Sequence, residues 1–484
     1  MAKVRDLTKG NIGKKLILFA IPMLLSSLIQ QLYNTVDLIY AGNLLGKSAS
    51  ASIGASSLLI TCLVGFFGGM SVGSGVVVSQ IYGARDEEKL KKAVHNAVAL
   101  CLAGGLLFML LGVVFAPVYL RLINTPWELQ AGAVSYLRIY MLSFPVLFLY
   151  NIGSGVLRAM GDSRSPLAAQ FAGGLVNVGM DYLFIRVFHD GVCGVAWATI
   201  FSQGVAAAIT LYNLSRLPDP YRLHGREIRF EASILKEVIR IGVPAGCQSL
   251  VITLSNVIAQ YFINSFGEDS IAAFTAYFKV ELIIYLPIVA FGQAIMAFSG
   301  QCKGAGDYRR IRKGTAICLV LSMLVAGLTS AAALRGGAVL FRIFNKEAAV
   351  IEAGLSIIRV SFPFYPIYCI LQVVGDSLRG CGKVKQPMLI VMLNICIIRT
   401  LLLWVLVPCT GSLQGVAVTY PITWALTAVC MMGYYVIYHR NAERSVRFGL
   451  KETETFRIDE EMEEKDAKTG GNNRKTLGLL RGWL

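Results

Sequence analysis

The sequence contains few charged residues. Asp, Glu, Lys and Arg make up 15% of the 484 residues, whereas hydrophobic residues make up 55% and the mean hydropathy is +0.61. A soluble globular domain typically has about 25% charged residues. The scarcity of charge therefore excludes an ordinary water-soluble protein and places most of the chain in lipid.

Motifs of metal and redox chemistry are also lacking. The sequence has no CxxC, HExxH or DDxxD motif, and its four histidines form no cluster along the chain. Its eleven cysteines lie singly in apolar segments, which is typical of small buried hydrophobic residues rather than of a metal site or a disulfide framework. These absences argue against a membrane-embedded enzyme, and we expect neither catalytic residues nor an organic cofactor.

Long apolar segments dominate what is present. A helix needs about 20 apolar residues to cross a bilayer. We count twelve segments of this length and therefore predict an all-α polytopic membrane protein with twelve transmembrane helices, six in each half. The segments lie near 14–41, 52–81, 93–115, 133–157, 166–188, 193–214, 236–264, 271–301, 314–341, 352–378, 387–408 and 413–438.

The basic residues are concentrated in alternate loops. Most of the 45 Lys and Arg lie at the chain ends and in every second loop between the predicted helices. Because basic residues accumulate on the cytoplasmic side of a membrane, we predict a multi-pass membrane protein with both termini cytoplasmic. The net charge of +16 then reflects topology and attraction to membrane lipids. Nucleic acid is not an expected partner, because no basic patch is interleaved with aromatic residues.

The chain repeats itself at a spacing of 221 residues. Two parallel repeats of six helices are typical of alternating-access transporters, whose similar halves rock about a central cavity. The repeat is visible in residues that hydrophobicity alone does not place: Gln80, Gly83, Asp86, Arg158 and Pro166 fall on Gln301, Gly304, Asp307, Arg379 and Pro387.

The polarity of the chain divides it into four regions. We predict an N-lobe of six helices over 1–214 and a C-lobe of six over 236–440. Prolines and charges in 215–235 indicate a cytoplasmic linker. Residues 441–484 are too polar to bury a core, so we predict a charged, disordered cytoplasmic tail.

Acidic residues inside the predicted helices are the candidates for chemistry. A charged carboxylate at the bilayer centre costs roughly 2.5–3.5 kcal/mol, so acids there tend to mark an ion path. Asp37 lies in the last third of the first helix, and Asp181 lies in the fifth, four residues after Asn177. That spacing puts Asn177 and Asp181 on one helix face. Thr199 in the sixth helix offers the nearest hydroxyl.

These four side chains suit a coupling ion. Two carboxylates, an amide carbonyl and a hydroxyl supply the oxygen ligands of a hard cation such as Na⁺. Two close carboxylates repel without a cation, so a proton can take the place of the metal. We therefore predict a cation-coupling site for Na⁺ or H⁺ at Asp37, Asn177, Asp181 and Thr199. The alternative is that the aspartates only anchor helix ends near the outer interface.

Longer stretches of the sequence resemble a known family. They look like the multidrug and toxic compound extrusion (MATE) family, and most of all its prokaryotic DNA-damage-inducible branch. The resemblance covers about residues 10 to 440 and recurs in both halves. The stretches are "FAIPMLLSSLIQQLYNTVDLIYAGNLLG", "SQIYGARDEEKLKKAV", "GVLRAMGDSRSPL", "LVNVGMDYLFI" and "GVCGVAWAT".

The resemblance implies a V-shaped bundle of two six-helix lobes that exports organic, often cationic compounds in exchange for Na⁺ or H⁺. In that branch the cation site lies in the N-lobe. An Asp on the first helix, an Asn and an Asp four apart on the fifth, and a Thr on the sixth form it. Asp37, Asn177, Asp181 and Thr199 occupy those positions. We therefore expect a secondary antiporter of the bacterial inner membrane, monomeric among membrane lipids, for small organic cations.

The second half departs from the first. Ala259 stands opposite Asp37, so the predicted site is not duplicated. We interpret Lys279 and Glu281 on the eighth helix as an internal charge pair or as lining of a substrate chamber, in preference to a second ion site. The sequence does not assign the roles of Asp376 and Arg399.

Several residues are candidates for the substrate chamber, although plain packing explains them equally well. The alternative function is a lipid-linked saccharide flippase of a related superfamily, which requires a strongly cationic chamber, whereas the predicted helices hold few basic residues. The sequence names neither the exported compound nor the coupling ion. The chamber candidates are Tyr33, Asn34, Tyr140, Met180, Lys279 and Glu281.

Overall fold

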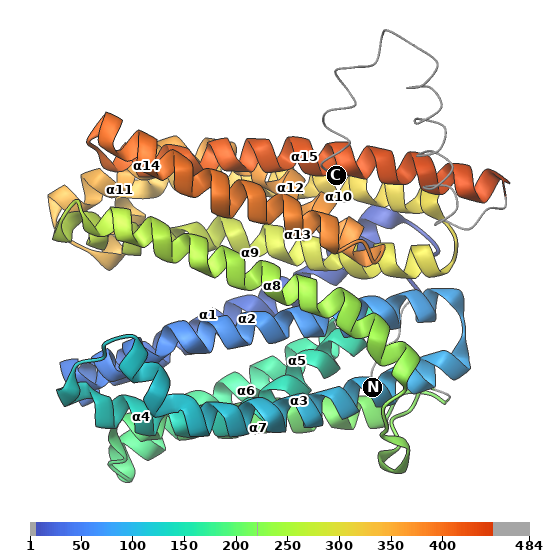
Figure 1. The fold of residues 1–484 in the computed structure, drawn as a ribbon, viewed down its shortest axis with the longest axis horizontal. Coiled ribbons are helices and arrows are strands. Elements are labelled where there is room, and N and C mark those ends of the chain that lie inside the picture. The colour runs from blue at the N-terminus through green and yellow to red at the C-terminus, as the bar shows by residue number, and fades with distance from the viewer. Residues whose placement is uncertain (1–5, 220, 449–484) are drawn as a thin grey trace, which may run out of the picture.

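The computed structural model describes residues 6–219 and 221–448, and this part of the chain is helical without a strand (Figure 1). The first half contains α1 (Ile12–Tyr40), η1 (Ala41–Leu45), α2 (Lys47–Ala84), α3 (Glu87–Leu122), α4 (Trp127–Leu142), α5 (Phe144–Ala159), α6 (Arg164–Tyr182), η2 (Leu183–Val187) and α7 (Gly191–Ser215). After the turn η3 (Gly225–Glu227), the second half contains α8 (Ala232–Asn264), α9 (Glu268–Gly304), α10 (Tyr308–Phe344), α11 (Ala348–Ser361), η4 (Phe362–Phe364), α12 (Tyr365–Gly380), α13 (Lys385–Val391), η5 (Met392–Ile398), α14 (Arg399–Thr410) and α15 (Leu413–Phe448).

The predicted all-α membrane fold is confirmed. Ten helical segments of the described chain are long and apolar enough to cross a membrane, and the pair α4 and α5, bent by 45°, makes an eleventh. The remaining predicted span, near 166–188, corresponds to α6 and η2. It is less apolar than the others because it carries Gln170, Asn177 and Asp181, which the fold buries.

The ends of the predicted regions differ slightly from the helices. Helix α15 continues to Phe448, so the first residues of the predicted tail 441–484 belong to the last helix. The rest of that tail, 449–484, lies outside the described residues, and its disorder stays a prediction. The predicted linker 215–235 contains η3 and the first turn of α8.

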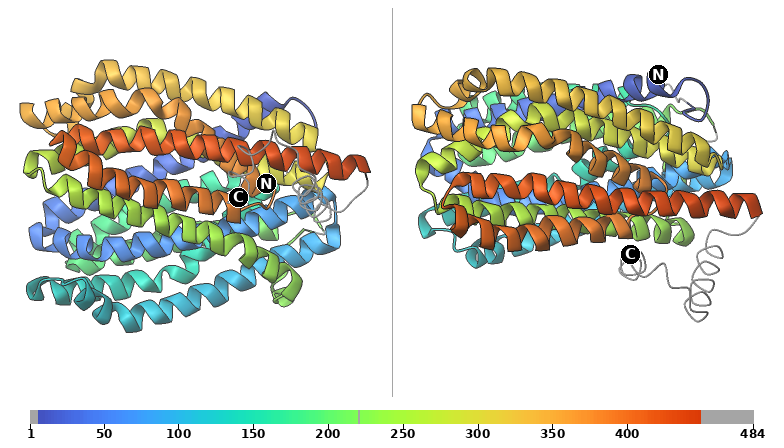
Figure 2. Two further views of the ribbon diagram at one scale, coloured as in Figure 1. Left: turned by 45° about the horizontal axis from the view of Figure 1, so that its top comes forward. Right: turned by 90° about the horizontal axis from the view of Figure 1, so that it is seen from above.

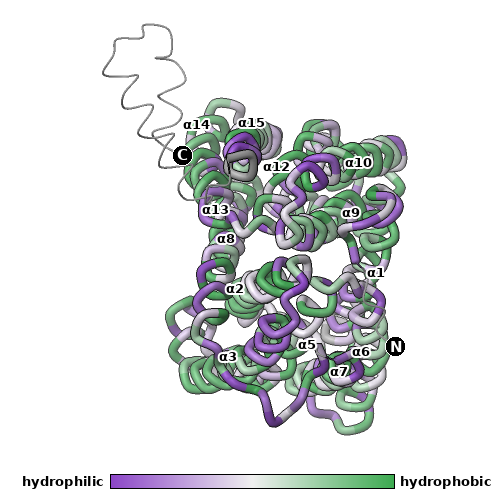
Figure 3. Tube along the Cα trace, turned by 90° about the vertical axis from the view of Figure 1, so that its right-hand side faces the viewer, coloured by the Kyte–Doolittle hydropathy of each residue, from purple (hydrophilic) through white to green (hydrophobic). Residues whose placement is uncertain are grey.

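The helices form two groups, one from each half of the chain, as Figures 1 and 3 show. Helix α1 packs on α6 in its own half and on α9 in the other half, while α8 packs mainly on α2 of the first half. Figure 2 shows the long helices running along the long axis of the molecule. Because the first helix of each repeat touches the opposite half, a movement of α1 or α8 acts on both groups.

The duplicated glutamines join the two groups symmetrically. Nε2 of Gln80 donates to the carbonyl of Gly380 at 2.8 Å, and Nε2 of Gln301 donates to the carbonyl of Ala159 at 2.7 Å. The repeat shift converts one bond into the other, so a pseudo-two-fold axis passes between them. We call this region, where α2 and α9 end, the closed end of the bundle.

Glycine allows the two groups to approach at the closed end. A Cβ on Gly83 would lie 2.0 Å from the carbonyl oxygen of Gln301, and a Cβ on Gly304 would lie 1.9 Å from that of Gln80. No side chain fits at such distances unless the two backbones separate. The residues that reveal the repeat in the sequence are therefore the residues through which the two halves touch.

Candidate ion-coupling site

The two aspartates of the predicted site come from neighbouring helices. Helix α1 carries Asp37 and packs on α6, which carries Asn177 and Asp181. Asn177 is 1% exposed and Asp181 is 0% exposed, and their four-residue spacing places them on one face of α6. Asp37 is partly buried. The fold thus brings the acids of the first and fifth predicted helices together.

Four oxygens of this cluster have no hydrogen-bond partner. The Asp37 carboxyl group interacts with the side chains of Asp181 and Asn177, yet Oδ1 of Asp37, Oδ1 of Asn177 and both Oδ atoms of Asp181 are buried without a partner. No ion pair within 6–219 and 221–448 includes either aspartate. Ionised carboxylates offer only acceptors, so a proton or a hard cation is the group that would satisfy these oxygens.

Both helices change to π-helical winding within about one turn after their acid. The π-helical segment η1 begins four residues after Asp37, and η2 begins two residues after Asp181. A third π-helical segment, η5, directly precedes Arg399. Such segments are rare and occur frequently at functional sites. All three π-helical segments in the described part of the chain therefore lie within about one turn of Asp37, Asp181 or Arg399.

Tyrosine side chains surround the acids. Tyr33 is 8% exposed and accepts a hydrogen bond from Nε2 of Gln170 at 3.3 Å. The rings of Tyr136 and Tyr140 have their centroids 6.0 Å apart, and both residues interact electrostatically with Asp37. Tyr33 and Tyr140 were predicted from the sequence, whereas Tyr136 and Gln170 were not. Tyr136 and Tyr140 are four residues apart and therefore share one helix face. This spacing is the signal from which Tyr136 could have been predicted.

No hydrogen bond of the described residues joins the other candidates of the first half to the acids. Thr199 is partly buried, and its hydroxyl donates to the carbonyl of Val195 at 3.1 Å, one turn earlier on α7. Among the described residues, no hydrogen bond joins it to either aspartate. Asn34 is exposed and Met180 is partly buried. The contacts therefore group the two aspartates with Asn177 and do not include Thr199.

The charged residues of the second half form separate contacts. The Tyr365 hydroxyl donates a hydrogen bond to Glu281, whereas Lys279 is exposed. Residues two apart on a helix point in different directions, so the charge pair considered for Lys279 and Glu281 is not formed within the described chain. The Arg399 guanidinium lies 4.4 Å from the centroid of the Tyr420 ring.

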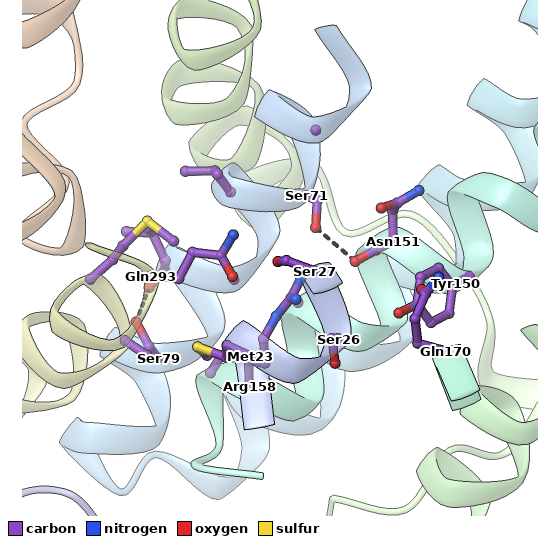
Figure 4. A pocket seen from close by; sticks show the side chains of 18 of the residues that line it. Met23, Ser26, Ser27, Ser71, Ser79, Tyr150, Asn151, Arg158, Gln170 and Gln293 are labelled. Atoms are coloured by element: carbon purple, nitrogen blue, oxygen red, sulfur yellow. Dashed lines mark hydrogen bonds between the residues drawn. The ribbon is translucent and has the colours of Figure 1, made fainter. Parts of the chain in front are cut away.

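A cavity of about 220 Å³ lies between the two groups near the closed end (Figure 4). Residues of α1, α2, α5, α6 and α9 line it, among them Ser26, Ser27, Arg158 and Gln170. Because Gln170 also binds Tyr33, it connects the cavity with the tyrosines around the acids. The six predicted chamber residues are not part of this lining.

The fold creates a histidine cluster that the sequence does not show. Ligand atoms of His95, His224 and Glu227 lie within 4.8 Å of one another, because the linker turn η3 folds back on α3. These atoms already have partners: the His224 backbone N–H donates to Nε2 of His95 at 3.0 Å, and Nζ of Lys91 lies 2.7 Å from the Glu227 carboxylate. The cluster corrects the expectation of isolated histidines, and its contacts fasten the linker to α3.

Comparisons with known proteins agree with this architecture. The MatE family model matches residues 22–183 and again residues 244–405, once in each half. "Probable multidrug resistance protein YpnP" of Bacillus subtilis (strain 168) is 30% identical over 398 residues, which cover 82% of this chain and 89% of that protein. "Multidrug export protein MepA" of Staphylococcus aureus (strain N315) is 23% identical over 363 residues, covering 73% of this chain and 78% of that protein.

Solved structures show the same fold. The structure described as "Crystal structure of MATE in the straight conformation" superimposes with a TM-score of 0.86 at 20% identity, covering 91% of this chain and 99% of that one. The family match spans both repeats and most of the chain. The protein is therefore a membrane transporter rather than an enzyme, and it belongs to the MATE family, as the resemblance of its sequence predicted.

Proposed function

We propose that this protein is a secondary antiporter of the bacterial inner membrane that exports cationic or amphiphilic organic compounds in exchange for Na⁺ or H⁺. The relatives described as multidrug resistance and multidrug export proteins support an organic substrate. The concentration of Lys and Arg at the chain ends and in alternate loops supports cytoplasmic termini. The motifs around Asp37 and Asp181 support the DNA-damage-inducible branch.

The observation that carries the proposal is the interaction of Asp37 with Asp181, whose carboxyl groups present three buried oxygens without a hydrogen-bond partner. An ionised carboxylate is costly inside a membrane, and two in contact also repel each other. A proton shared by the pair removes both costs, and so does Na⁺ bound by the pair together with the amide oxygen of Asn177. The two carboxyl groups and the amide oxygen therefore give the site an affinity for an incoming cation.

Helix α1 links the site to the movement of the halves. It holds Asp37 against α6, packs along α9 of the opposite half, and contains Pro22, which interrupts its backbone hydrogen bonds. Repulsion between the charged aspartates drives α1 away from α6, and neutralisation lets the two helices close. The ion thereby favours one arrangement of the halves over the other, which is what coupled transport requires.

The work comes from the ion gradient, which supplies about 2.3 kcal/mol per charge per 100 mV in addition to the concentration term. The test is efflux of a fluorescent organic cation from proteoliposomes under a Na⁺ gradient at fixed pH, or under a pH gradient without Na⁺. We expect one gradient to drive efflux against the dye gradient. If neither gradient does so, the proposed coupling is wrong.

A smaller effect is expected from replacing Thr199. We expect Thr199→Val to slow coupled efflux by less than about fivefold, because the hydroxyl bonds to its own helix and a single hydrogen bond contributes only about 1 kcal/mol. The initial efflux rate measures the effect, and Thr199→Ser, which keeps the hydroxyl, is the control. A loss of all coupling in the valine variant alone would instead make Thr199 an ion ligand.

A further inference from the structure

One arginine that is present in both repeats has different surroundings in each. Arg158 at the end of α5 and Arg379 at the end of α12 occupy equivalent positions. In the second half, Arg379 forms an ion pair with Asp376, which also accepts a hydrogen bond from Nε2 of Gln372 at 2.6 Å. The positive charge of the second repeat is therefore neutralised by a carboxylate one turn earlier on the same helix.

The first repeat has no such carboxylate. Gly155 stands where the second repeat has Asp376, and a Cβ on Gly155 would lie 2.8 Å from Oγ and 3.2 Å from the carbonyl oxygen of Ser71. The close packing of α2 on α5 thus leaves no room for an acid. No ion pair of the described chain includes Arg158. The titratable group that interacts electrostatically with the Arg158 guanidinium is the phenol of Tyr150, which is neutral at physiological pH.

The unpaired guanidinium faces the cavity between the two halves. Figure 4 shows Arg158 among the side chains that line it, together with the hydroxyls of Ser26, Ser27 and Tyr150. A partly buried cation in such a place is stabilised by an anion that accepts its hydrogen bonds. Arginine donates in a planar fork that matches a carboxylate or a phosphate group. The hydroxyls add donors for the remaining oxygens of such a group.

We propose that this cavity binds the anionic group of an amphiphilic ligand, a carboxylate, sulfonate or phosphate, on Arg158. At about 220 Å³ the cavity is smaller than the roughly 300–1,000 Å³ of a pocket for a whole drug-sized molecule, so it takes one end of the ligand. The inference rests on the proposed function, because it makes this cavity part of the substrate path. The anion belongs either to an exported zwitterion or to a lipid headgroup.

The test compares two probes that differ only in one negative charge. A rhodamine with a free carboxylate and its methyl ester are titrated against the full-length protein in phosphatidylcholine nanodiscs, with fluorescence polarisation as readout. We expect Arg158→Gln to weaken binding of the carboxylate probe about tenfold, the effect of losing one charge-assisted hydrogen bond, and to leave the ester within about twofold. Arg158→Lys keeps the charge and should retain most of the preference.

The repeat supplies a matched control. The double variant Arg379→Gln, Asp376→Asn removes the neutralised pair at the equivalent position, and we expect it to change neither affinity by more than about twofold. If Arg158→Gln does not fold, competition on the wild type decides instead, because phenyl phosphate should displace the carboxylate probe at lower concentration than it displaces the ester. Nanodiscs with added phosphatidylglycerol separate the sources of the anion. Weaker binding of the carboxylate probe there, in the wild type only, assigns the anion to a lipid headgroup.

The outcomes separate this inference from the proposed function. If the wild type binds both rhodamines and Arg158→Gln weakens the binding of both equally, the anion site is wrong and the transport proposal stands. The same conclusion follows if the wild type binds both probes with equal affinity and phenyl phosphate displaces both at the same concentration. If the wild type binds neither probe, the cavity is not a chamber for amphiphiles, and the proposed substrate class falls with the inference.

Discussion

Asp37→Asn is expected to abolish ion-driven efflux while leaving the protein folded. Asparagine has almost the shape of aspartate, and its amide can donate to the unsatisfied oxygens of Asp181. The site of this variant is therefore always in a state like the neutralised one, and it cannot respond to an ion. Coupling energies between two sites are typically about 1–3 kcal/mol, so the initial rate under the driving gradient should fall by about 100-fold. Proteoliposome efflux measures the rate, and size-exclusion chromatography checks the fold.

The control for this prediction is an acid near the same helices but outside the cluster. Asp190 is exposed at the start of α7 and caps no helix with its side chain, so Asp190→Asn should transport at the wild-type rate. Asp181→Asn should match Asp37→Asn, and the double variant should be no worse than either, because the two carboxyls act as one unit. Wild-type transport by Asp37→Asn would end the coupling role of this pair.

The core of the site could be predicted because its signals are local or unusual. Acids are rare inside membrane helices, and the spacing of Asn177 and Asp181 fixes their common face from sequence alone. The partnership with Asp37 needed the packing of α1 on α6, which the resemblance to the MATE family implied and hydrophobic periodicity could not. Thr199 was predicted as the nearest hydroxyl and from that resemblance, but its hydrogen bond to Val195 is a detail that sequence does not specify.

The remaining features depend on contacts between the halves. Nothing in the hydropathy of α2 indicates that Gln80 reaches the carbonyl of Gly380, although the repeat showed that Gln80 and Gln301 are equivalent. Arg158 was recognised only as a mark of the repeat, since its position beside a cavity requires the tertiary structure. The span containing α6 fell below the others in hydropathy because its polar residues face the protein interior rather than lipid.

Replacing a glycine at the closed end should produce the second large effect. In Gly83→Val the new Cβ would lie 2.0 Å from the carbonyl oxygen of Gln301, and a backbone oxygen cannot move aside as a flexible side chain can. Overpacking costs typically about 1–3 kcal/mol, which lowers the population of the closed arrangement by about 5- to 150-fold relative to any arrangement in which the halves have separated there. We expect Gly304→Val, its equivalent in the repeat, to have the same effect.

Distances across the closed end measure this shift. Spin labels at Glu88→Cys and Arg309→Cys occupy exposed, repeat-equivalent positions on α3 and α10, and they require a background in which accessible native cysteines are replaced. Double electron–electron resonance should show a longer mean distance in Gly83→Val than in the parent. Gly327→Val on α10 is the control, because no atom lies within 4 Å of the added Cβ, and it should leave the distribution unchanged. An unchanged distance distribution in Gly83→Val would contradict this prediction. It would mean that one half had rearranged locally to make room for the valine, and that the contact between Gly83 and Gln301 does not hold the two halves together.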